Sequence, residues 1–405
     1  MNVNSPYSPP PLPADSRNRF DAAFQSAIAE GVFPGACLLV ARDRKVVFEG
    51  TWGRVKTGGV PVSATTRFDL ASLTKALVTA PLCMIAADAG ALGLDDSISR
   101  FFPSLVDKDK DAITVRSLLS HSSGLPPYVP FYLKLAPLPA PQRRDALASM
   151  ILNTPLDSAP GKAPNYSDLG FMLLGLILER RLGGRLDRLA RELLFEPLGI
   201  DELHFCPLHS PASVAASLQQ DDSSVSTHAR GRYAATQYCP WRKKLLWGEV
   251  DDENCWALDG VAGHAGLFGT ARGVFQLLNF LWGLYESNGA GKSPVSGTCA
   301  HPHPPISPET LRLFWTRTDP AGSSDWCLGF DTPSAKGYSS AGGLISQKSI
   351  GHLGFTGVSF WLDLKNRILI ILLTNRVHPT RKNDDIRQFR PLLHDIVMKE
   401  LLYGN

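Results

Sequence analysis

A serine and a lysine three residues apart are the first residues in this chain whose types and spacing suggest chemistry. Ser72 and Lys75 stand at the start of an apolar run, residues 76–86, that is typical of a buried helix. Residues three apart on a helix share one face, so the lysine amine can take the serine proton and create a nucleophile. The N–H of Ser72 is also placed to bind a developing oxyanion. Ordinary helices with a serine cap and a solvated lysine share this spacing, so the pattern alone leaves both interpretations open.

A second stretch, residues 165–168, contains groups that such a pair would need. Tyr166 comes just before a helical pattern, and a phenol held beside a lysine can relay protons as general base and acid. Asp168, two residues later, can hold the lysine charge or bind a substrate amide. The competing interpretation of Tyr166 is a packing residue at a helix start.

A third stretch, residues 351–357, begins a predicted strand and is rich in small residues. Gly354 would let a substrate approach the strand backbone, and the N–H of Phe355 would complete an oxyanion hole. His352 is ambiguous from the residues alone, because a lone histidine is more often structural than catalytic. We expect Gly354 and Phe355 to contact substrate, and we include Asp168 and His352 as candidate substrate contacts that the residues alone leave open.

The elements that must position these residues form a sheet drawn from both ends of the chain. Alternation and apolar runs predict strands at residues 36–40, 46–49, 351–361 and 367–375. The last of these runs is apolar throughout, which indicates a central strand that is covered on both faces. Helical periodicity predicts helices at residues 20–28, 143–152, 169–181, 186–194 and 385–403.

This order of elements predicts an α+β fold, with an antiparallel sheet flanked by helices and an inserted helical lobe. We expect the sheet lobe at residues 18–75 and 250–405, and the mainly helical lobe at 76–249. Residues 1–17 form a Pro-rich tail, and the Gly- and Pro-rich residues 286–308 indicate a surface insertion.

The composition of the 405 residues excludes several classes of function. A formal net charge of +3 is too small to suggest nucleic acid or a membrane surface as a partner. Seven scattered cysteines without a C-x-x-C pair indicate neither a disulfide framework nor a zinc site. The chain has no H-E-x-x-H, P-loop or G-x-G-x-x-G motif, so we expect no metal and no cofactor. Without an apolar segment near Met1 or a bilayer-length run, the expected location is cytoplasmic.

The three stretches, in this order, resemble the serine β-lactamase and penicillin-binding protein superfamily. The closest similarity is to its class C-like branch of β-lactamases, D-aminopeptidases and carboxylesterases, and it spans residues 23–391. Residues 113–125 resemble the ITVRHLLTHTSGL run, 166–178 the YSNxGYxLLGxIIE run, and 260–271 the GGLFSTA segment. The resemblance implies a β-lactamase/DD-peptidase-like fold. Ser72 would be the acylated nucleophile, Lys75 its base, and Tyr166 the proton relay.

Two departures from the family pattern shape the expected function. Asp168 stands where many members carry Asn, which adds negative charge beside Lys75. His352 stands where β-lactamases carry a lysine that holds the substrate carboxylate, and a neutral imidazole is a poorer anchor. We therefore expect a carboxylesterase for small or medium acyl esters. The alternatives are an amide hydrolase of the same fold (a D-aminopeptidase, a DD-peptidase or a weak β-lactamase) and an inactive binding protein. The expected partner is a small-molecule ester or amide, and the oligomeric state stays open.

Overall fold

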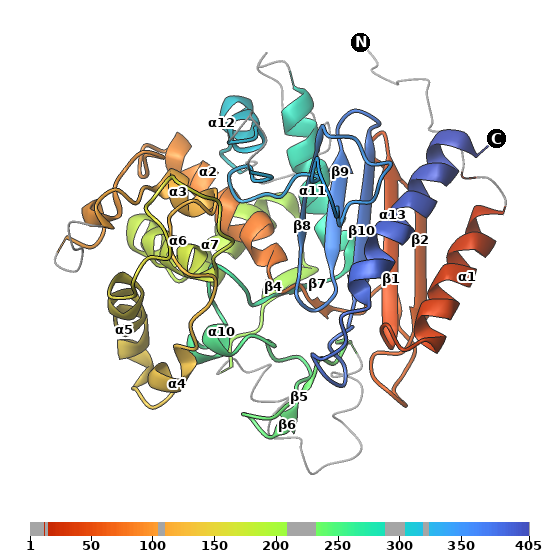
Figure 1. The fold of residues 1–405 in the computed structure, drawn as a ribbon, viewed down its shortest axis with the longest axis horizontal. Helices are drawn as coiled ribbons and strands as arrows, with labels where there is room; N and C mark the ends of the chain where they lie inside the picture. The colour runs from red at the N-terminus through yellow and green to blue at the C-terminus, as the bar shows by residue number, and fades with distance from the viewer. Residues whose placement is uncertain are drawn as a thin grey trace.

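A five-stranded antiparallel sheet is the central element of the fold (Figure 1). The computed structural model describes residue 12 and residues 15–103, 110–208, 232–287, 304–318 and 324–404. The strand order is β2-β1-β10-β9-β8. The strands are β1 (Gly35–Arg42), β2 (Lys45–Gly53), β8 (Ser349–Leu353), β9 (Ser359–Asp363) and β10 (Ile368–Thr374). The predicted α+β class and the assembly of one sheet from distant segments are both confirmed.

The two ends of the chain meet at the centre of this sheet. Strand β1 pairs with β10 over its length, with Ala36 opposite Thr374 and Arg42 opposite Ile368. Every residue of β10 is buried. The prediction of a central strand covered on both faces is therefore confirmed, and the cover explains why the run is apolar without alternation.

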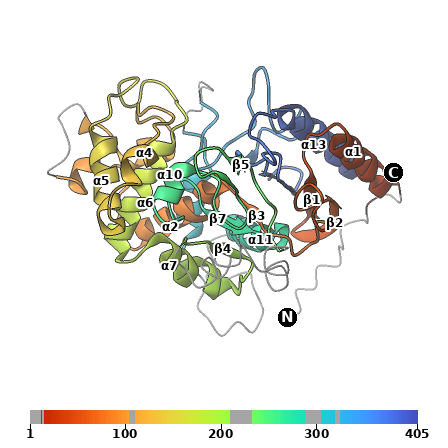
Figure 2. The same cartoon turned by 90° about the horizontal axis from the view of Figure 1, so that it is seen from below.

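Helices cover the two faces of the sheet and bury alternate residues of β1. Leu38 and Val40 join a core with α1 (Ser16–Ala29) and α13 (Ile386–Tyr403). Leu39 and Ala41 join the larger core on the opposite face, where α11 (Ala271–Glu286) packs against β1 and β10. Figures 1 and 2 show α1 and α13 side by side on the outer face. The sheet therefore separates two apolar cores.

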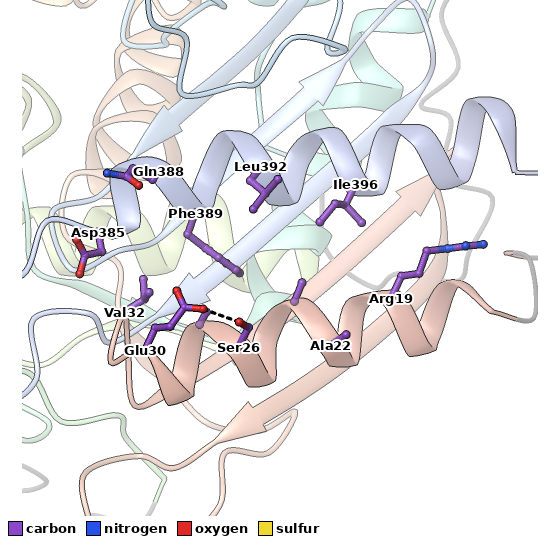
Figure 3. Close-up of a pocket in the computed structure, with 12 residues that line it drawn as sticks. Arg19, Ala22, Ser26, Glu30, Val32, Asp385, Gln388, Phe389, Leu392 and Ile396 are labelled. Carbon is purple, nitrogen blue, oxygen red and sulfur yellow. Dashed lines mark hydrogen bonds between the residues drawn. The ribbon is translucent and has the colours of Figure 1, made fainter.

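A groove of about 830 Å³ lies between α1 and α13 (Figure 3). Ala22 and Ser26 line it from α1, and Phe389 and Leu392 from α13. Its buried apolar residues, Ala27, Val32 and Phe389, belong to the outer core, whereas Leu70 and Leu73 beside Ser72 belong to the core on the other face. The sheet thus lies between this groove and Ser72.

The helices between β2 and β4 gather around one buried helix, α6 (Asp168–Leu182). Residues 169–178 of α6 are buried without exception, and α6 contacts α2, α3, α5 and α7. The helices of this part are α2 (Ala80–Asp88), α3 (Val115–Leu119), α4 (Tyr132–Leu135), α5 (Ala140–Leu152) and α7 (Leu186–Ala190). Short helical turns are η2 (Ile98–Arg100), η4 (Arg191–Phe195) and η5 (Glu196–Leu198).

Three short strands cross between the predicted lobes. Strand β7 (Leu267–Gly269) pairs with both β3 (Phe68–Asp69) and β4 (Leu203–Phe205). Because β4 falls inside the predicted helical lobe and β7 inside the predicted sheet lobe, the two-lobe division stays a prediction. The remaining elements are β5 (Tyr238–Cys239), β6 (Lys244–Leu245), α10 (Glu253–Ala257) and α12 (Pro308–Phe314).

The prediction of one strand over residues 351–361 is wrong. Strand β8 ends at Leu353 and β9 begins at Ser359, so the stretch forms a hairpin. The N–H of Gly354 donates to the carbonyl of Val358 and closes the turn, and Gly357 has a φ of +104° that favours glycine. Most of the predicted insertion at 286–308 lies outside the described residues. In the whole described part of the chain, no helix combines the length and apolar character that crossing a bilayer requires.

Candidate active site

Ser72 lies in a strained turn between β3 and a short buried helix. The preceding residue, Ala71, has a φ of +45°, which a residue with a Cβ rarely adopts. The carboxylate of Asp69 accepts a hydrogen bond from the N–H of Ala71 at 2.9 Å, and Thr74 Oγ1 donates to the Ala71 carbonyl at 2.7 Å. Thr356 Oγ1 donates to the backbone carbonyl of Asp69 at 2.6 Å, which ties the turn to the β8–β9 hairpin. Side chains on both sides therefore hold the turn that presents Ser72.

Lys75 begins the π-helical turn η1 (Lys75–Thr79) and is fully buried. Its Nζ donates to Ser72 Oγ at 2.9 Å, to Asp168 Oδ1 at 2.7 Å and to the carbonyl of His264 at 3.1 Å. The three N–H groups of an ammonium are thus all used. The spacing in the sequence correctly predicted that Lys75 and Ser72 share a face.

The charge on Lys75 depends on its neighbours more than on its burial. Burial by itself disfavours the ammonium, but Asp168 and Tyr166 outweigh that cost and raise the pKa of Lys75 above its ordinary value. Lys75 is therefore protonated in the resting site. It must lose a proton before it can act as a base.

Tyr166 lies directly before α6, with Ser167 as the N-cap whose Oγ accepts from the N–H of Gly170 at 3.4 Å. The Tyr166 ring lies beside Lys75, whose Nζ is 5.0 Å from the ring centre. Burial raises the pKa of the Tyr166 phenol in spite of the lowering effect of Lys75. The phenol is therefore neutral and can give a proton. Ser72, Lys75, Tyr166 and Asp168 are all brought together.

His121 fixes the position of Tyr166, a role that the sequence pattern did not indicate. Its carbonyl accepts from the N–H of Asn165 at 2.7 Å, and its Nδ1 accepts from the N–H of Ser167 at 3.1 Å. The two bonds bracket Tyr166, and the imidazole and phenol ring centres lie 4.5 Å apart. The available signal was the histidine itself, which lies in the 113–125 run that resembles the family segment. In the structure His121 adopts a left-handed conformation, with a φ of +55°.

The start of the β8–β9 turn lies against the Ser72 turn. A Cβ added to Gly354 would lie 2.3 Å from Val358 Cγ2 and 2.9 Å from the carbonyl oxygen of Leu70, so a larger residue does not fit. Phe355 follows, with half of its surface exposed and the Arg376 guanidinium 4.5 Å from its ring centre. Within the described part of the chain, no acceptor is found for the N–H of Ser72 or of Phe355. Both are therefore available to an oxyanion.

His352 lies behind the site and does not line the pocket beside Ser72. It is buried, its Nδ1 is 2.8 Å from the carbonyl oxygen of Leu353, and its ring centre is 6.3 Å from that of Tyr166. Burial and the charge of Lys75 lower the pKa of His352 to about 3. The imidazole is therefore neutral. Its predicted contact with substrate stays a prediction.

A pocket of about 160 Å³ opens beside Ser72, and carboxylates dominate its walls. Three of the carboxylates, residues 251–253, are consecutive in the sequence, but only the fold brings them to Asp69 and Asp168. Among the residues that the structure describes, no group of His, Cys, Asp and Glu has a metal-binding arrangement. The lining residues are Asp69, Ala71, Ser72, Tyr128, Asp168, Asp251, Asp252, Glu253, His264, Ala265, Phe355, Thr356 and Arg381.

The chain is similar to known proteins over almost its full length. The family model described as Beta-lactamase matches residues 20–393. An Escherichia coli K12 protein named "Putative D-alanyl-D-alanine carboxypeptidase" is 30% identical, over 89% of this chain and 82% of that protein.

Two solved structures show the same fold. EstCE1, described as a hydrolase with promiscuous acyltransferase activity, has a TM-score of 0.69 at 21% identity and covers 95% of this chain and 98% of its own. An octameric penicillin-binding protein homologue from Pyrococcus abyssi has a TM-score of 0.64 at 19% identity, with 95% of this chain and 76% of that chain covered.

Proposed function

The chain belongs to the beta-lactamase family, and on that premise we propose that it is a serine hydrolase that forms an acyl-enzyme on Ser72. We further propose that it acts as a carboxylesterase on small or medium acyl esters. The observation that carries the proposal is the 2.9 Å bond between Lys75 Nζ and Ser72 Oγ. The N–H groups of Ser72 and of Phe355, in the adjoining β8–β9 turn, have no acceptor among the described residues. Nucleophile, base and oxyanion donors are the minimum set for acyl transfer.

The proposed reaction uses these groups in sequence. Ser72 Oγ attacks the ester carbonyl carbon while its proton passes to a neutral Lys75 amine. The N–H groups of Ser72 and Phe355 hold the oxyanion. The bond to the leaving alcohol then breaks, Tyr166 gives its proton to the alcohol oxygen, and Lys75 returns a proton to Tyr166. Water attacks the acyl-enzyme by the same route in reverse and frees the acid and Ser72.

Ser72→Ala tests the proposal directly. The variant should lose hydrolysis of p-nitrophenyl butanoate and covalent labelling by a fluorophosphonate, because it lacks the nucleophilic oxygen. Ser149→Ala, on α5 and outside the pocket, is the matched control and should keep both. Labelling of Ser72→Ala at the wild-type level, located by peptide mass spectrometry, would show that another residue is the nucleophile.

An amide hydrolase is the second candidate, and the name of the Escherichia coli relative favours it. Comparing the butanoyl p-nitrophenyl ester with butanoyl p-nitroanilide separates the two, since the acyl group is the same. An esterase should have a much larger kcat/KM for the ester than for the anilide, after correction for their uncatalysed rates. If the chain is instead an inactive binding protein, the fluorophosphonate should not label it and it should cleave neither substrate.

The cytoplasmic location also stays a proposal. The six cysteines among the described residues are all free thiols, and five of them are buried. Free thiols support a reducing compartment. Cell fractionation followed by immunoblotting is the direct measurement.

A further inference from the structure

The pocket beside Ser72 carries an excess of negative charge. Five carboxylates line it: Asp69, Asp168, Asp251, Asp252 and Glu253. The cations that line the pocket or pair with its carboxylates are Arg381 and Lys75, which is bonded to Asp168. Arg376, beside Phe355, and Arg242, which donates to the backbone carbonyl of Asp251, are paired with Asp384 and Glu249 outside the pocket. Burial, and after it the charge of Asp251, raise the pKa of Asp69 to about 7.

Arg381 is not free to bind a substrate carboxylate. Its Nε donates to Asp251 Oδ2 at 2.8 Å, and its two terminal nitrogens lie 2.9 and 3.1 Å from the oxygens of Glu253. One of them also donates to the backbone carbonyl of Asp251 at 2.8 Å. A substrate carboxylate would have to displace these bonds and face the remaining acidic groups.

Two buried polar atoms in residues that line the pocket have no partner among the described residues. Asp251 is 3% exposed and its Oδ1 accepts no hydrogen bond, although Oδ2 is paired with Arg381. His264 is 1% exposed; its Nε2 bonds Asp252 at 2.9 Å, whereas its Nδ1 has no partner. Buried polar atoms without partners are rare in folded proteins. A ligand that donates hydrogen bonds would satisfy them.

A protonated amine fits these observations. It neutralises part of the acidic cluster, and one of its three N–H groups can donate to the unpaired oxygen of Asp251. A short aminoalkyl group also suits a pocket of about 160 Å³. The ring of Tyr128 on the pocket wall would also favour a cation. We propose that this pocket selects substrates whose acyl group carries a protonated amine close to the scissile carbonyl. The inference rests on the proposed function, because it names the substrate class of the same site.

Three p-nitrophenyl esters of matched size test the proposal at pH 7. The 3-aminopropanoyl ester carries the cation, the butanoyl ester is its neutral isostere, and the succinyl ester carries an anion. With uncatalysed rates subtracted, kcat/KM should be at least tenfold higher for 3-aminopropanoyl than for butanoyl, and lowest for succinyl. Equal values for the cationic and neutral esters, or a preference for succinyl, would overturn the proposal.

Asp251→Asn links the preference to the pocket. The ratio of kcat/KM between the cationic and neutral esters should fall at least fivefold. Asp145→Asn is the matched control: it removes a carboxylate whose side chain is 81% exposed on α5 and should leave the ratio unchanged. If Asp251→Asn does not fold, Glu253→Gln supplies the same measurement, and an unchanged ratio there contradicts the proposal.

The two proposals fail in different ways. If Ser72 is not the nucleophile, the Ser72→Ala variant hydrolyses each of the three esters at the same rate as wild-type protein. If only the substrate class is wrong, wild-type protein hydrolyses them in a Ser72-dependent manner without preferring the amine.

Discussion

Asp168 controls the residue that the proposed chemistry needs as a base. Its Oδ1 lies 2.7 Å from Lys75 Nζ, and its charge is the first influence that favours the ammonium over the free amine. Where an asparagine occupies this position in related sequences, that charge is missing. Whether residue 168 is aspartate or asparagine therefore sets the pH at which Lys75 becomes neutral. Activity should rise as the pH passes through that value.

Asp168→Asn should move the pH profile of ester hydrolysis. Lys75 must be deprotonated to accept the Ser72 proton, so kcat/KM of wild-type protein should keep rising into the alkaline range. Without the Asp168 charge the pKa of Lys75 falls, and the rising limb should shift to lower pH by about one unit or more. The measurement is kcat/KM for p-nitrophenyl butanoate between pH 6 and 10, with Asp145→Asn as control. An unshifted limb would mean that the ionisation of Lys75 does not limit the reaction.

The residues that the sequence could predict are those whose partners lie nearby in the chain. Ser72 and Lys75 are separated by one helical turn, so their 2.9 Å contact follows from local geometry. Asp251 and Arg381 lie 130 positions apart and meet only because the fold joins their segments. No periodicity encodes such a meeting. The sequence shows the acidic run 251–253, but it does not indicate that this run meets Asp69, Asp168 and Arg381 beside Ser72.

At the scale of elements, the edge strand β8 is already partly paired. The N–H and carbonyl of Gly351 bond the carbonyl and N–H of Asp331, each at 2.8 Å. An extended substrate cannot add to the strand at Gly351 and has access only beyond it, toward Phe355. The Asp331 residue is partly exposed, but burial of its carboxyl group raises the pKa of that group to about 8. The backbone of Asp331 therefore closes the edge, and its carboxyl group is neutral at pH 7.

Asp331→Asn should change how stability depends on pH. The folded chain holds this proton up to about pH 8, whereas the unfolded chain releases it near the ordinary value of 3.8. The folded state therefore binds more protons in that window, so Asp331 makes the free energy of unfolding fall as pH rises from about 4 to 8. Asparagine removes this dependence, and the variant should gain stability relative to wild type as pH rises.

Urea unfolding at pH 5 and pH 8 measures the Asp331 effect, with Asp145→Asn as control. The difference in the free energy of unfolding between variant and wild type should be more favourable to the variant at pH 8. A difference that is the same at both values would show that Asp331 is ionised in the folded chain.

Element types were easier to predict than the β8–β9 turn. The run from Ile368 to Leu373 is apolar without interruption, which indicates a strand that is covered on both faces. The small residues of the 351–357 stretch predict that a substrate can approach the strand backbone there. Two of them, Gly354 and Gly357, also make the turn that splits the predicted strand. A glycine serves both purposes equally well in a sequence. Only the pairing of Leu353 with Ser359 decides between them.

At the scale of the whole molecule, the sheet separates a core that supports the site from one that supports only the fold. Phe24 belongs to the outer core, where its ring stacks on Trp52 with the ring centres 3.8 Å apart. Phe389 of α13 packs edge-on against it at 5.4 Å. The residues beneath Ser72, among them Leu70 and Leu73, belong to the other core.

Phe24→Ala should therefore lower stability and leave catalysis unchanged. Removing a fully buried phenylalanine costs about 3–5 kcal/mol of unfolding free energy, because the cavity stays largely unfilled. Urea unfolding gives the loss, and kcat/KM for p-nitrophenyl butanoate below the transition gives the activity. A drop in kcat/KM beyond threefold in folded protein would mean that the two cores are coupled through the sheet.

The pairing of β1 with β10 also has a consequence for synthesis on the ribosome. Strand β10 begins 326 positions after the end of β1, so at roughly 5–20 residues per second the hairpin of β1 and β2 waits about 16–65 s for its neighbour. During that interval the inner edge of β1 offers open backbone groups and apolar side chains to other chains. The nascent protein must therefore be shielded by chaperones or kept dilute, and a message truncated before β10 would yield a chain that cannot close its sheet.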